Sequence, residues 1–265
     1  FEARDKLGGL NEYGIAAYKT VNNFAEREVR WLLKIGGITP KLGMELGKNV
    51  QLSDLRENYD AVFLAIGLGG VNELSLEDEN VFGVLDAVNF ISELRQASEL
   101  ENIPVGRNVV VVGGGMTAVD AAVQSKLLGA ENVTIVYRRG LDQMSASVKE
   151  REHATSSGVR ILTHWFPKGI ITNDDQLEEI VFAYAKSSNG KLEAGSEEIN
   201  LKSDQIFKAI GQTCDEIDSK INGPSQKVTT IEGGRIGGQN IWAGGDCSSE
   251  GEDLTVTAVA QGRDA

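Results

Sequence analysis

The apolar positions of this chain fall into short runs separated by glycine-rich turns, and the most regular runs lie near its middle. Residues 109–112 are four consecutive valines, a run too short to span a membrane and typical of a strand buried on both faces. Apolar residues at helical spacing follow over residues 119–128, and a second apolar strand follows over residues 132–137. This order of strand, turn, helix and strand predicts a βαβ unit in a parallel sheet.

The turn that links the first strand to the helix has the sequence Gly-Gly-Gly-Met-Thr-Ala, which fits the pattern G-x-G-x-x-A. We expect Gly113 to let the chain turn sharply and Gly115 to leave room for a pyrophosphate against the backbone. Ala118 lets the helix lie close to the sheet, and the helix N-terminus offers free N–H groups to phosphates. The alternative is a tight turn that binds no ligand. Its place inside a βαβ unit favours a dinucleotide site made by Gly113, Gly114, Gly115, Met116, Thr117 and Ala118.

The end of the second strand indicates which nucleotide is bound. A site for NAD usually places Asp or Glu there, to accept a hydrogen bond from the ribose 2′-hydroxyl. Here the chain has Arg138 and Arg139. Two guanidinium groups suit a 2′-phosphate, because their planar donors match phosphate oxygens and stay charged. The pair therefore predicts NADPH rather than NADH, the alternative being two arginines in a solvated loop.

Two further strands end in the same three residues. Residues 61–67 end in Ala-Ile-Gly at Gly67, and residues 203–211 end in Ala209-Ile210-Gly211. Because these strands flank the βαβ unit, they look like the paired points at which the chain leaves one domain and returns to it. We therefore predict an inserted domain of residues 69–205 and a discontinuous domain of residues 1–68 and 206–265.

Other patterns predict individual elements. Apolar residues at three- and four-residue spacing over residues 21–35 predict a helix with Trp31 in the core. Ser53 is expected to cap the next short helix. Residues 170–202 have the alternation of a β-meander or hairpin, with a turn at Asn189-Gly190.

Composition narrows the class of protein. The chain has 265 residues, of which 41% are hydrophobic, enough for one large or two medium domains. A net charge of −13 argues against nucleic acid and anionic membrane surfaces as partners. Cys214 and Cys247 are far apart in sequence, which indicates a reducing, cytoplasmic compartment and neither a disulfide scaffold nor a complete metal site. No signal peptide or membrane-spanning run is evident in the sequence. The two histidines, His153 and His164, lie in no motif, and no catalytic residue or metal ligand is predicted.

Taken together, these motifs resemble those of the flavin reductases that bind two dinucleotides, and most of all the glutamate synthase small subunit and the electron-input part of dihydropyrimidine dehydrogenase. The resemblance extends over nearly the whole chain. It implies an α/β fold of two Rossmann-like dinucleotide-binding domains, with the NAD(P)-binding domain inserted into a discontinuous FAD-binding domain. The motifs that carry it are Glu2, Gly8-Gly9-Leu10, Tyr13-Gly14-Ile15, the two Ala-Ile-Gly strand ends, residues 113–120, Tyr137-Arg138-Arg139 and residues 242–246.

The resemblance also implies which residues contact FAD. Phe1-Glu2 resembles the tail of a strand that ends in an acid, the position from which a carboxylate binds the adenosine ribose of a dinucleotide. Gly245-Asp246 would contact the ribityl and pyrophosphate groups, and a helix N-terminus at Thr255-Val256 would favour the anionic, reduced flavin ring. The other FAD or nicotinamide contacts implied are Gly9, Leu10 and Lys19 along the FAD, with Gly67, Ala209 and Gly211 at the two strand ends.

The chemistry implied is hydride transfer from nicotinamide C4 to flavin N5, followed by single-electron transfer to iron–sulfur clusters of a larger catalytic subunit or domain. The cofactors carry this reaction, so no protein acid or base is expected. Thioredoxin-reductase-like disulfide chemistry is not expected, because neither Cys214 nor Cys247 has a close cysteine partner in sequence.

Several departures from the family pattern shape these expectations. The first strand and glycine motif for the FAD pyrophosphate would precede Phe1, as would the four-cysteine iron–sulfur region, and the last helix stops at Ala265. Met116 stands where relatives often have Asn or Asp. We therefore expect the chain by itself to bind NADPH without retaining stoichiometric FAD. The alternatives are an NADP(H)-binding fragment with no activity of its own, and the dihydropyrimidine dehydrogenase input subunit using NADH.

Overall fold

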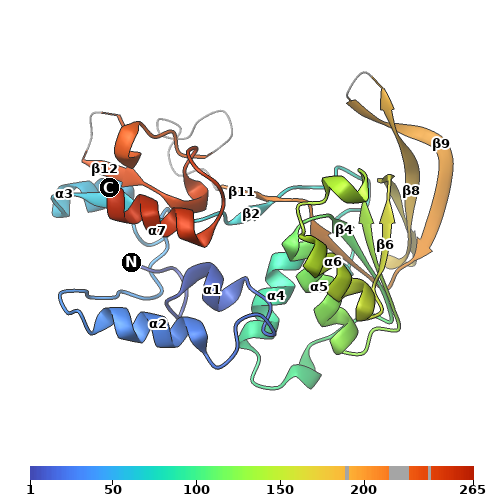
Figure 1. Cartoon of the computed structure of the whole chain (residues 1–265), viewed down its shortest axis with the longest axis horizontal. Coiled ribbons are helices and arrows are strands. Elements are labelled where there is room, and N and C mark those ends of the chain that lie inside the picture. The colour runs from blue at the N-terminus through green and yellow to red at the C-terminus, as the bar shows by residue number, and fades with distance from the viewer. Residues whose placement is uncertain (189–190, 215–226, 238–239) are drawn as a thin grey trace. The chain divides into compact units, whose positions relative to one another are not determined.

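The valine strand is the central strand of a five-stranded parallel sheet (Figure 1). The structure is a computed structural model and describes residues 1–188, 191–214, 227–237 and 240–265. The sheet has the order β3-β10-β4-β5-β6, and α5 (Met116–Leu127) joins β4 to β5 as the sequence predicted. Its strands are β3 (Val84–Asp86), β4 (Asn108–Gly113), β5 (Asn132–Tyr137), β6 (Arg160–Thr163) and β10 (Gln205–Ala209).

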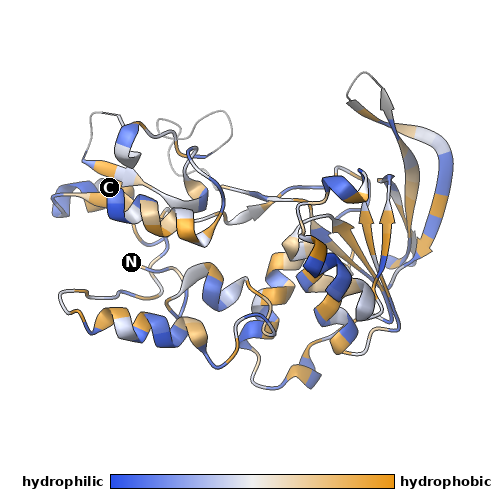
Figure 2. Cartoon of the chain, viewed as in Figure 1, coloured by the Kyte–Doolittle hydropathy of each residue, from blue (hydrophilic) through white to orange (hydrophobic). Residues whose placement is uncertain are grey.

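Both faces of this sheet are covered, which is why its strands are continuously apolar (Figure 2). Val109 and Val111 point to the face packed by helices, where Phe90 of α4 stacks on Phe207 of β10 with ring centroids 4.3 Å apart. Val110 and Val112 point to the opposite face and join a second apolar cluster. The helices of the first face are α4 (Ala87–Gln96), α5 and α6 (Val148–Ser156).

The second face is covered by a three-stranded antiparallel meander in the order β7-β8-β9. Phe182 and Ile180 of β8 are fully buried against the sheet. The meander predicted over residues 170–202 is confirmed, whereas the expected turn at Asn189-Gly190 lies outside the described residues. The strands are β7 (Trp165–Asn173), β8 (Gln176–Ser188) and β9 (Lys191–Lys202).

The chain divides into two compact units. One consists of Gly8–Lys34 and Val71–Gly211, and contains the five-stranded sheet. The other consists of Phe1–Leu7, Ile35–Gly70 and Gln212–Ala265. The sequence predicts that residues 1–68 belong to one domain, whereas residues 8–34 group with the five-stranded sheet in the structure.

Arg95 of α4 explains why residues 8–34 join the sheet unit. Its side chain is only 8% exposed, and it donates hydrogen bonds to the backbone carbonyls of Asn11, Glu12 and Thr20 at 3.2, 2.9 and 3.0 Å. A buried guanidinium that supplies several donors to loop carbonyls holds that loop firmly. The segment includes the helices α1 (Gly9–Tyr13) and α2 (Phe24–Leu33).

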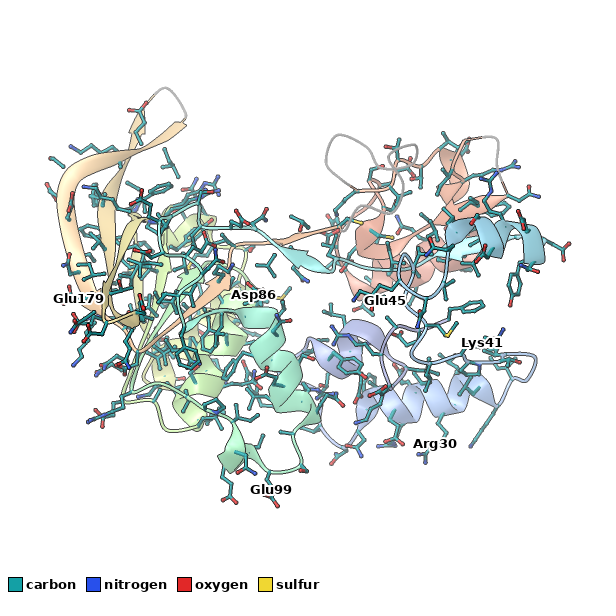
Figure 3. All side chains as sticks on the ribbon, turned by 180° about the vertical axis from the view of Figure 1, so that it is seen from behind. Arg30, Lys41, Glu45, Asp86, Glu99 and Glu179 are labelled. Atoms are coloured by element: carbon teal, nitrogen blue, oxygen red, sulfur yellow. The ribbon has the colours of Figure 1, made fainter. Side chains whose placement is uncertain are left out.

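Two expectations about helices were wrong. Trp31 is 66% exposed, and Ala25 is the only buried residue that α2 contributes to the described structure. The periodicity correctly predicted the helix α2 and its apolar face, but periodicity does not show whether other residues cover that face. The opposite, polar face of α2 carries exposed residues such as Arg30 (Figure 3). Ser53 lies inside α3 (Leu52–Asn58), whose N-cap residue is Gln51.

The other unit is built on a parallel pair of strands, β1 (Val62–Leu64) and β12 (Ile241–Ala243). Both strands contribute to a small apolar core that also contains Val228 and Ile236. The short strands β2 (Gly70–Val71) and β11 (Gln212–Thr213) pair with each other at the two unit boundaries. The last helix is α7 (Thr255–Asp264), and the 3₁₀ turns of the chain are η1 (Leu100–Asn102), η2 (Leu141–Gln143), η3 (Glu232–Gly234) and η4 (Gly245–Cys247).

No helix in the described ranges is both long enough and apolar enough to cross a lipid bilayer.

Candidate nucleotide-binding site

The glycine turn lies at the carboxyl ends of β4 and β10, where the chain order of the sheet reverses. In open α/β sheets, ligands bind in the crevice at such a switch point. Gly113 has a φ of +152°. A Cβ built on Gly113 would lie 2.2 Å from the carbonyl oxygen of Ala209, so glycine is required there by close backbone approach as well as by conformation.

Gly114 is needed for a different reason. A Cβ built on it would lie 2.5 Å from the ring of Tyr137, the last residue of β5. The Tyr137 hydroxyl donates to the carbonyl of Gln143 at 3.0 Å. The Tyr137 ring therefore packs against the glycine turn, and its hydroxyl is hydrogen-bonded to the loop of residues 140–147, which follows the two arginines.

Gly115 and the start of α5 form the part of the turn that is open to a ligand. Gly115 is the N-cap residue of α5, and none of the described side chains caps this helix end. Ala118 is fully buried against the sheet, as predicted, whereas Met116 is exposed. An uncapped N-terminus of a 12-residue helix presents free N–H donors and a partial positive charge, which suits a phosphate.

The two arginines lie directly after β5, on the same edge of the sheet. Arg138 and Arg139 are both exposed, and neither guanidinium forms an ion pair or hydrogen bond within the described part of the chain. In a protein with a net charge of −13, two neighbouring arginines without acidic partners are available to bind an anion.

The sequence motifs do not predict a role for the loop after the arginines, residues 140–147. The Ala146 N–H donates to the Gly114 carbonyl at 3.1 Å, which ties this loop to the glycine turn. Met144 and Ala146 are buried, while Ser145 between them is exposed. In the sequence, the alternation of apolar and hydroxyl residues over residues 144–147 is the local signal from which these buried and exposed positions could have been predicted.

Lys19 belongs to the sheet unit and is engaged there in two ion pairs. Its Nζ lies 2.6 Å from Asp120 Oδ1 of α5 and 2.8 Å from Glu150 Oε1 of α6. Burial lowers the pKa of Lys19, but its hydrogen bonds to these carboxylates outweigh that effect and raise the pKa. Burial raises the pKa of Glu150, whereas the bonds from Lys19 and Ser147 lower it overall.

Asp120 also accepts a hydrogen bond from the Tyr18 hydroxyl at 2.8 Å and one from the Ala16 N–H at 3.3 Å. Burial and the nearby Asp120 carboxylate raise the pKa of Tyr18, which keeps its hydroxyl a donor. Together these contacts fix the segment that contains Lys19 on α5. Of the other residues expected there, Leu10 is exposed and Gly9 has a φ of +50° with open space around it.

In the other unit, the structure brings Gly245 and Asp246 to the carboxyl end of the parallel strand pair. The Gly244 N–H donates to Leu64 at 3.1 Å, and the Gly245 N–H donates to Oε1 of Gln261 in α7 at 2.7 Å. Burial and the charge of Asp253 raise the pKa of Asp246, against an opposing effect of Lys227.

The first turn of α7 contains Thr255 and Val256, both exposed, and no described side chain caps this helix. The Glu2 carboxylate accepts a hydrogen bond from the Arg4 N–H at 3.0 Å. The Glu2 N–H donates to the Lys41 carbonyl, and the Glu2 carbonyl accepts from the Met44 N–H. Of the residues at the predicted crossing points, Gly67 and Gly211 have φ values of +66° and +99°, and Ala209 ends β10.

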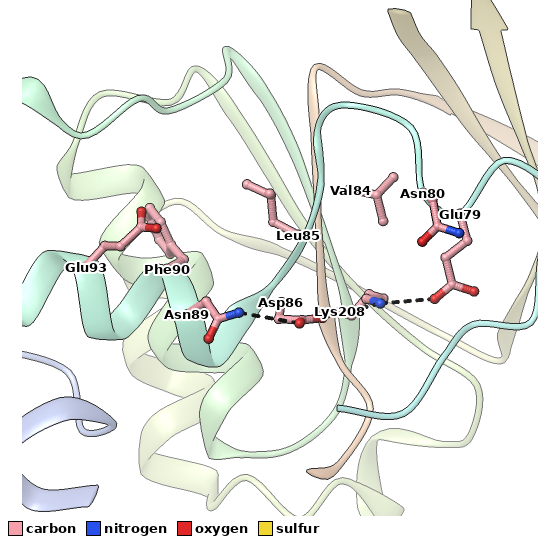
Figure 4. A pocket seen from close by; sticks show the side chains of 9 residues that line it. All are labelled: Glu79, Asn80, Val84, Leu85, Asp86, Asn89, Phe90, Glu93 and Lys208. Carbon is pink, nitrogen blue, oxygen red and sulfur yellow. Dashed lines mark hydrogen bonds and ion pairs between the residues drawn. The ribbon is translucent and has the colours of Figure 1, made fainter. Parts of the chain in front are cut away.

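A cavity of about 340 Å³ lies elsewhere in the sheet unit, beside β3 and α4 (Figure 4). Lys208 of β10 lies 3.1 Å from Glu79 and 3.3 Å from Asp86, so one positive charge is shared by two carboxylates and these three side chains keep a net negative charge. Burial raises the pKa of Glu79, but the Leu74 N–H and Lys208 lower it overall. This internally paired network is typical of structural ion pairs rather than of a phosphate site.

Within the described residues, Cys214 and Cys247 are buried and neither forms a disulfide, and no group of three or more His, Cys, Asp or Glu side chains is placed to hold a metal ion. Burial raises the pKa of Cys247, which makes its thiol a poor nucleophile. This part of the chain therefore offers no redox-active cysteine pair.

The fold and site define the class of protein: an α/β oxidoreductase with a Rossmann-like dinucleotide-binding fold. The family model of the pyridine nucleotide-disulphide oxidoreductases matches residues 6–262, and the chain belongs to this family. The resemblance and the fold class inferred from the sequence motifs are thereby confirmed.

Individual relatives agree with the family assignment. The chain is 33% identical to the glutamate synthase [NADPH] small chain of Escherichia coli K12 over all of its own length and 61% of that protein. It is 28% identical to the NAD-dependent dihydropyrimidine dehydrogenase subunit PreT of Escherichia coli O157:H7, again over its whole length and 60% of that protein. It thus spans about three fifths of the length of these relatives.

Among solved structures, FprA of Mycobacterium tuberculosis in complex with NADPH superimposes with a TM-score of 0.77, covering 97% of this chain and 73% of that one. The two are 20% identical, so this likeness concerns the fold alone.

Proposed function

We propose that the chain is an NADPH-dependent flavin oxidoreductase module that passes electrons from NADPH through FAD to iron–sulfur clusters of a larger partner subunit or domain, as in a glutamate synthase small subunit. Its similarity to such small chains over its whole length supports this function. The two buried cysteines form no disulfide within the described residues, which supports a cytoplasmic location and argues against disulfide chemistry.

The observation that carries the proposal is the pairing of an uncapped helix N-terminus with two free arginines at one sheet edge. The N–H groups at the start of α5, opened by Gly115, suit the pyrophosphate of a dinucleotide. Arg138 and Arg139, at the end of the next strand, suit a 2′-phosphate on its adenosine ribose. This combination selects NADPH over NADH.

The residues proposed to contact FAD are Glu2, Gly9, Leu10, Lys19, Gly245, Asp246, Thr255 and Val256. Gly67, Ala209 and Gly211 are proposed as further cofactor contacts. When bound, the flavin accepts a hydride and releases electrons singly. The uncapped start of α7 gives the chain a partial positive charge that would stabilise the reduced ring. No side-chain acid or base is assigned.

Calorimetric titration with NADPH and NADH tests the nucleotide assignment. Replacing both Arg138 and Arg139 with Ala should weaken NADPH binding by about 2–4 kcal/mol, roughly 30- to 900-fold, with little effect on NADH. Arg107→Ala is the matched control, because Arg107 is also exposed but is paired with Glu131. Equal losses for both nucleotides would contradict the 2′-phosphate assignment, and a wild-type preference for NADH would favour the dihydropyrimidine dehydrogenase type of input subunit.

Electron transfer is tested separately, by NADPH-dependent reduction of ferricyanide with FAD added in excess. We expect turnover that depends on both FAD and NADPH. Tight NADPH binding without any FAD-dependent turnover would leave a nucleotide-binding module and contradict the flavin half of the proposal.

A further inference from the structure

One hydroxyl group lies beside the open position of the glycine turn. A Cβ built on Gly115 would lie 3.3 Å from Ser145 Oγ, and no other described atom beyond its immediate chain and helix neighbours comes within 4 Å of it. None of the described side chains caps α5, so the Ser145 hydroxyl borders a helix end whose N–H groups are free. The space that a ligand would use at Gly115 is therefore bordered by a hydroxyl.

The position of Ser145 is fixed by its neighbours rather than by its own side chain. The next residue, Ala146, donates its N–H to the Gly114 carbonyl at 3.1 Å. Met144 and Ala146 are buried on either side. Before Ser145 in the chain, the Tyr137 hydroxyl donates to the Gln143 carbonyl at 3.0 Å. Residues 143–146 are therefore bonded at one end to the last residue of β5 and at the other to the glycine turn.

The two serines of this loop are used differently. Ser147 caps α6, since its Oγ accepts from the Glu150 N–H at 3.3 Å and the Glu150 carboxylate accepts from the Ser147 N–H at 2.9 Å. The Ser145 hydroxyl makes no hydrogen bond to any residue in the described ranges. A fixed hydroxyl without an internal partner, beside an uncapped helix N-terminus, can donate to an anion bound there.

We propose that Ser145 Oγ donates a hydrogen bond to a pyrophosphate oxygen of the dinucleotide, completing the phosphate site formed by the N-terminus of α5. This inference rests on the nucleotide site of the proposed function and adds to it a residue outside the glycine motif. The pyrophosphate is the group that sits at a helix N-terminus in this fold, and NADPH and NADH share it. Ser145 should therefore contribute to the affinity for both nucleotides, whereas the arginines decide between them.

The test is calorimetric titration of NADPH and NADH into wild type, Ser145→Ala, Ser145→Thr and the control Ser156→Ala. Ser156 is an exposed serine in the last turn of α6, where its hydroxyl bonds only to the His153 carbonyl. We expect Ser145→Ala to weaken both nucleotides by a similar factor of about ten, from loss of one bond to a charged group. Ser145→Thr, which keeps the hydroxyl, should restore most of the affinity, and Ser156→Ala should change neither.

The outcomes separate this inference from the proposed function. If wild type binds NADPH and Ser145→Ala binds both nucleotides as tightly as wild type, the inference is wrong and the nucleotide site stands. A loss confined to NADPH would assign Ser145 to the 2′-phosphate and overturn the pyrophosphate contact. Wild type that binds neither nucleotide would overturn the proposed function and the inference with it.

Discussion

Gly113 and Ala209 approach so closely that a Cβ on the glycine would lie 2.2 Å from the alanine carbonyl oxygen. The two residues are paired in register at the ends of β4 and β10, although 96 positions separate them in the chain. The first glycine of the dinucleotide motif is therefore also the contact that closes the sheet at its switch point. A residue expected to serve only the turn is equally a packing residue.

Gly113→Ala should destabilise the sheet unit strongly. The new methyl group meets the Ala209 backbone, and the residue must hold a positive φ, so we expect a loss of about 2–4 kcal/mol in the free energy of unfolding. Urea denaturation followed by circular dichroism measures this loss. Gly129→Ala is the matched control, because Gly129 also has a positive φ of +103° but open space around it, and should cost only about 1 kcal/mol. Equal losses would show that conformation alone matters.

Arg95→Met should release residues 8–34 from the sheet unit. It removes the donors to Asn11, Glu12 and Thr20 from a site that is nearly closed to water, and should lower the free energy of unfolding by about 3 kcal/mol. Hydrogen exchange of the α1 amides should accelerate, whereas that of β4 should not. The surface variant Arg107→Met should leave both unchanged, and unchanged α1 exchange in Arg95→Met would contradict the anchoring role.

The Lys19–Glu150 ion pair predicts a dependence of stability on pH in the acid range. The pKa of Glu150 is lowered below its ordinary value of 4.5, so the unfolded state binds protons first as the pH falls. Its contribution is present above about pH 4.5 and is lost as the pH falls through the lower folded-state value. Lys19→Gln removes the part of this contribution that comes from Lys19 and leaves the part that comes from Ser147. The difference in unfolding free energy between wild type and Lys19→Gln should therefore shrink from pH 6 to pH 3, and a difference that stays constant would contradict the coupling.

Limited proteolysis should cut near residues 67–70 or 211–214, at the unit boundaries, where the strands β2 and β11 are each only two residues long. The fragment that contains β4 should still bind NADPH. Residues 8–34 should stay associated with it under native conditions through Arg95 and Asp120, and separate from it in denaturant. Cleavage scattered through β4 would contradict the division into units.

The sequence alone determined the local parts of the site. Consecutive valines predicted a strand buried on both faces, and the glycine pattern predicted the turn and the helix behind it, because strand and helix spacing depends on residues only two to four positions apart. The position of Arg138 and Arg139 at the end of the second strand followed from the order of elements in that βαβ unit. The apolar run at residues 132–137 coincides with β5.

Only the tertiary structure decided what each of these parts contacts. Trp31 looked like a core residue because its helix is amphipathic, but periodicity does not reveal whether an apolar face is covered. The requirement for Gly114 comes from the ring of Tyr137, and the position of residues 8–34 comes from Arg95, more than seventy positions away. Such contacts join residues distant in the chain, and their energies depend on the packed arrangement of the whole unit. For the same reason Ser145, which belongs to no sequence motif, is placed beside the glycine turn only by the tertiary hydrogen bond from Ala146 to Gly114.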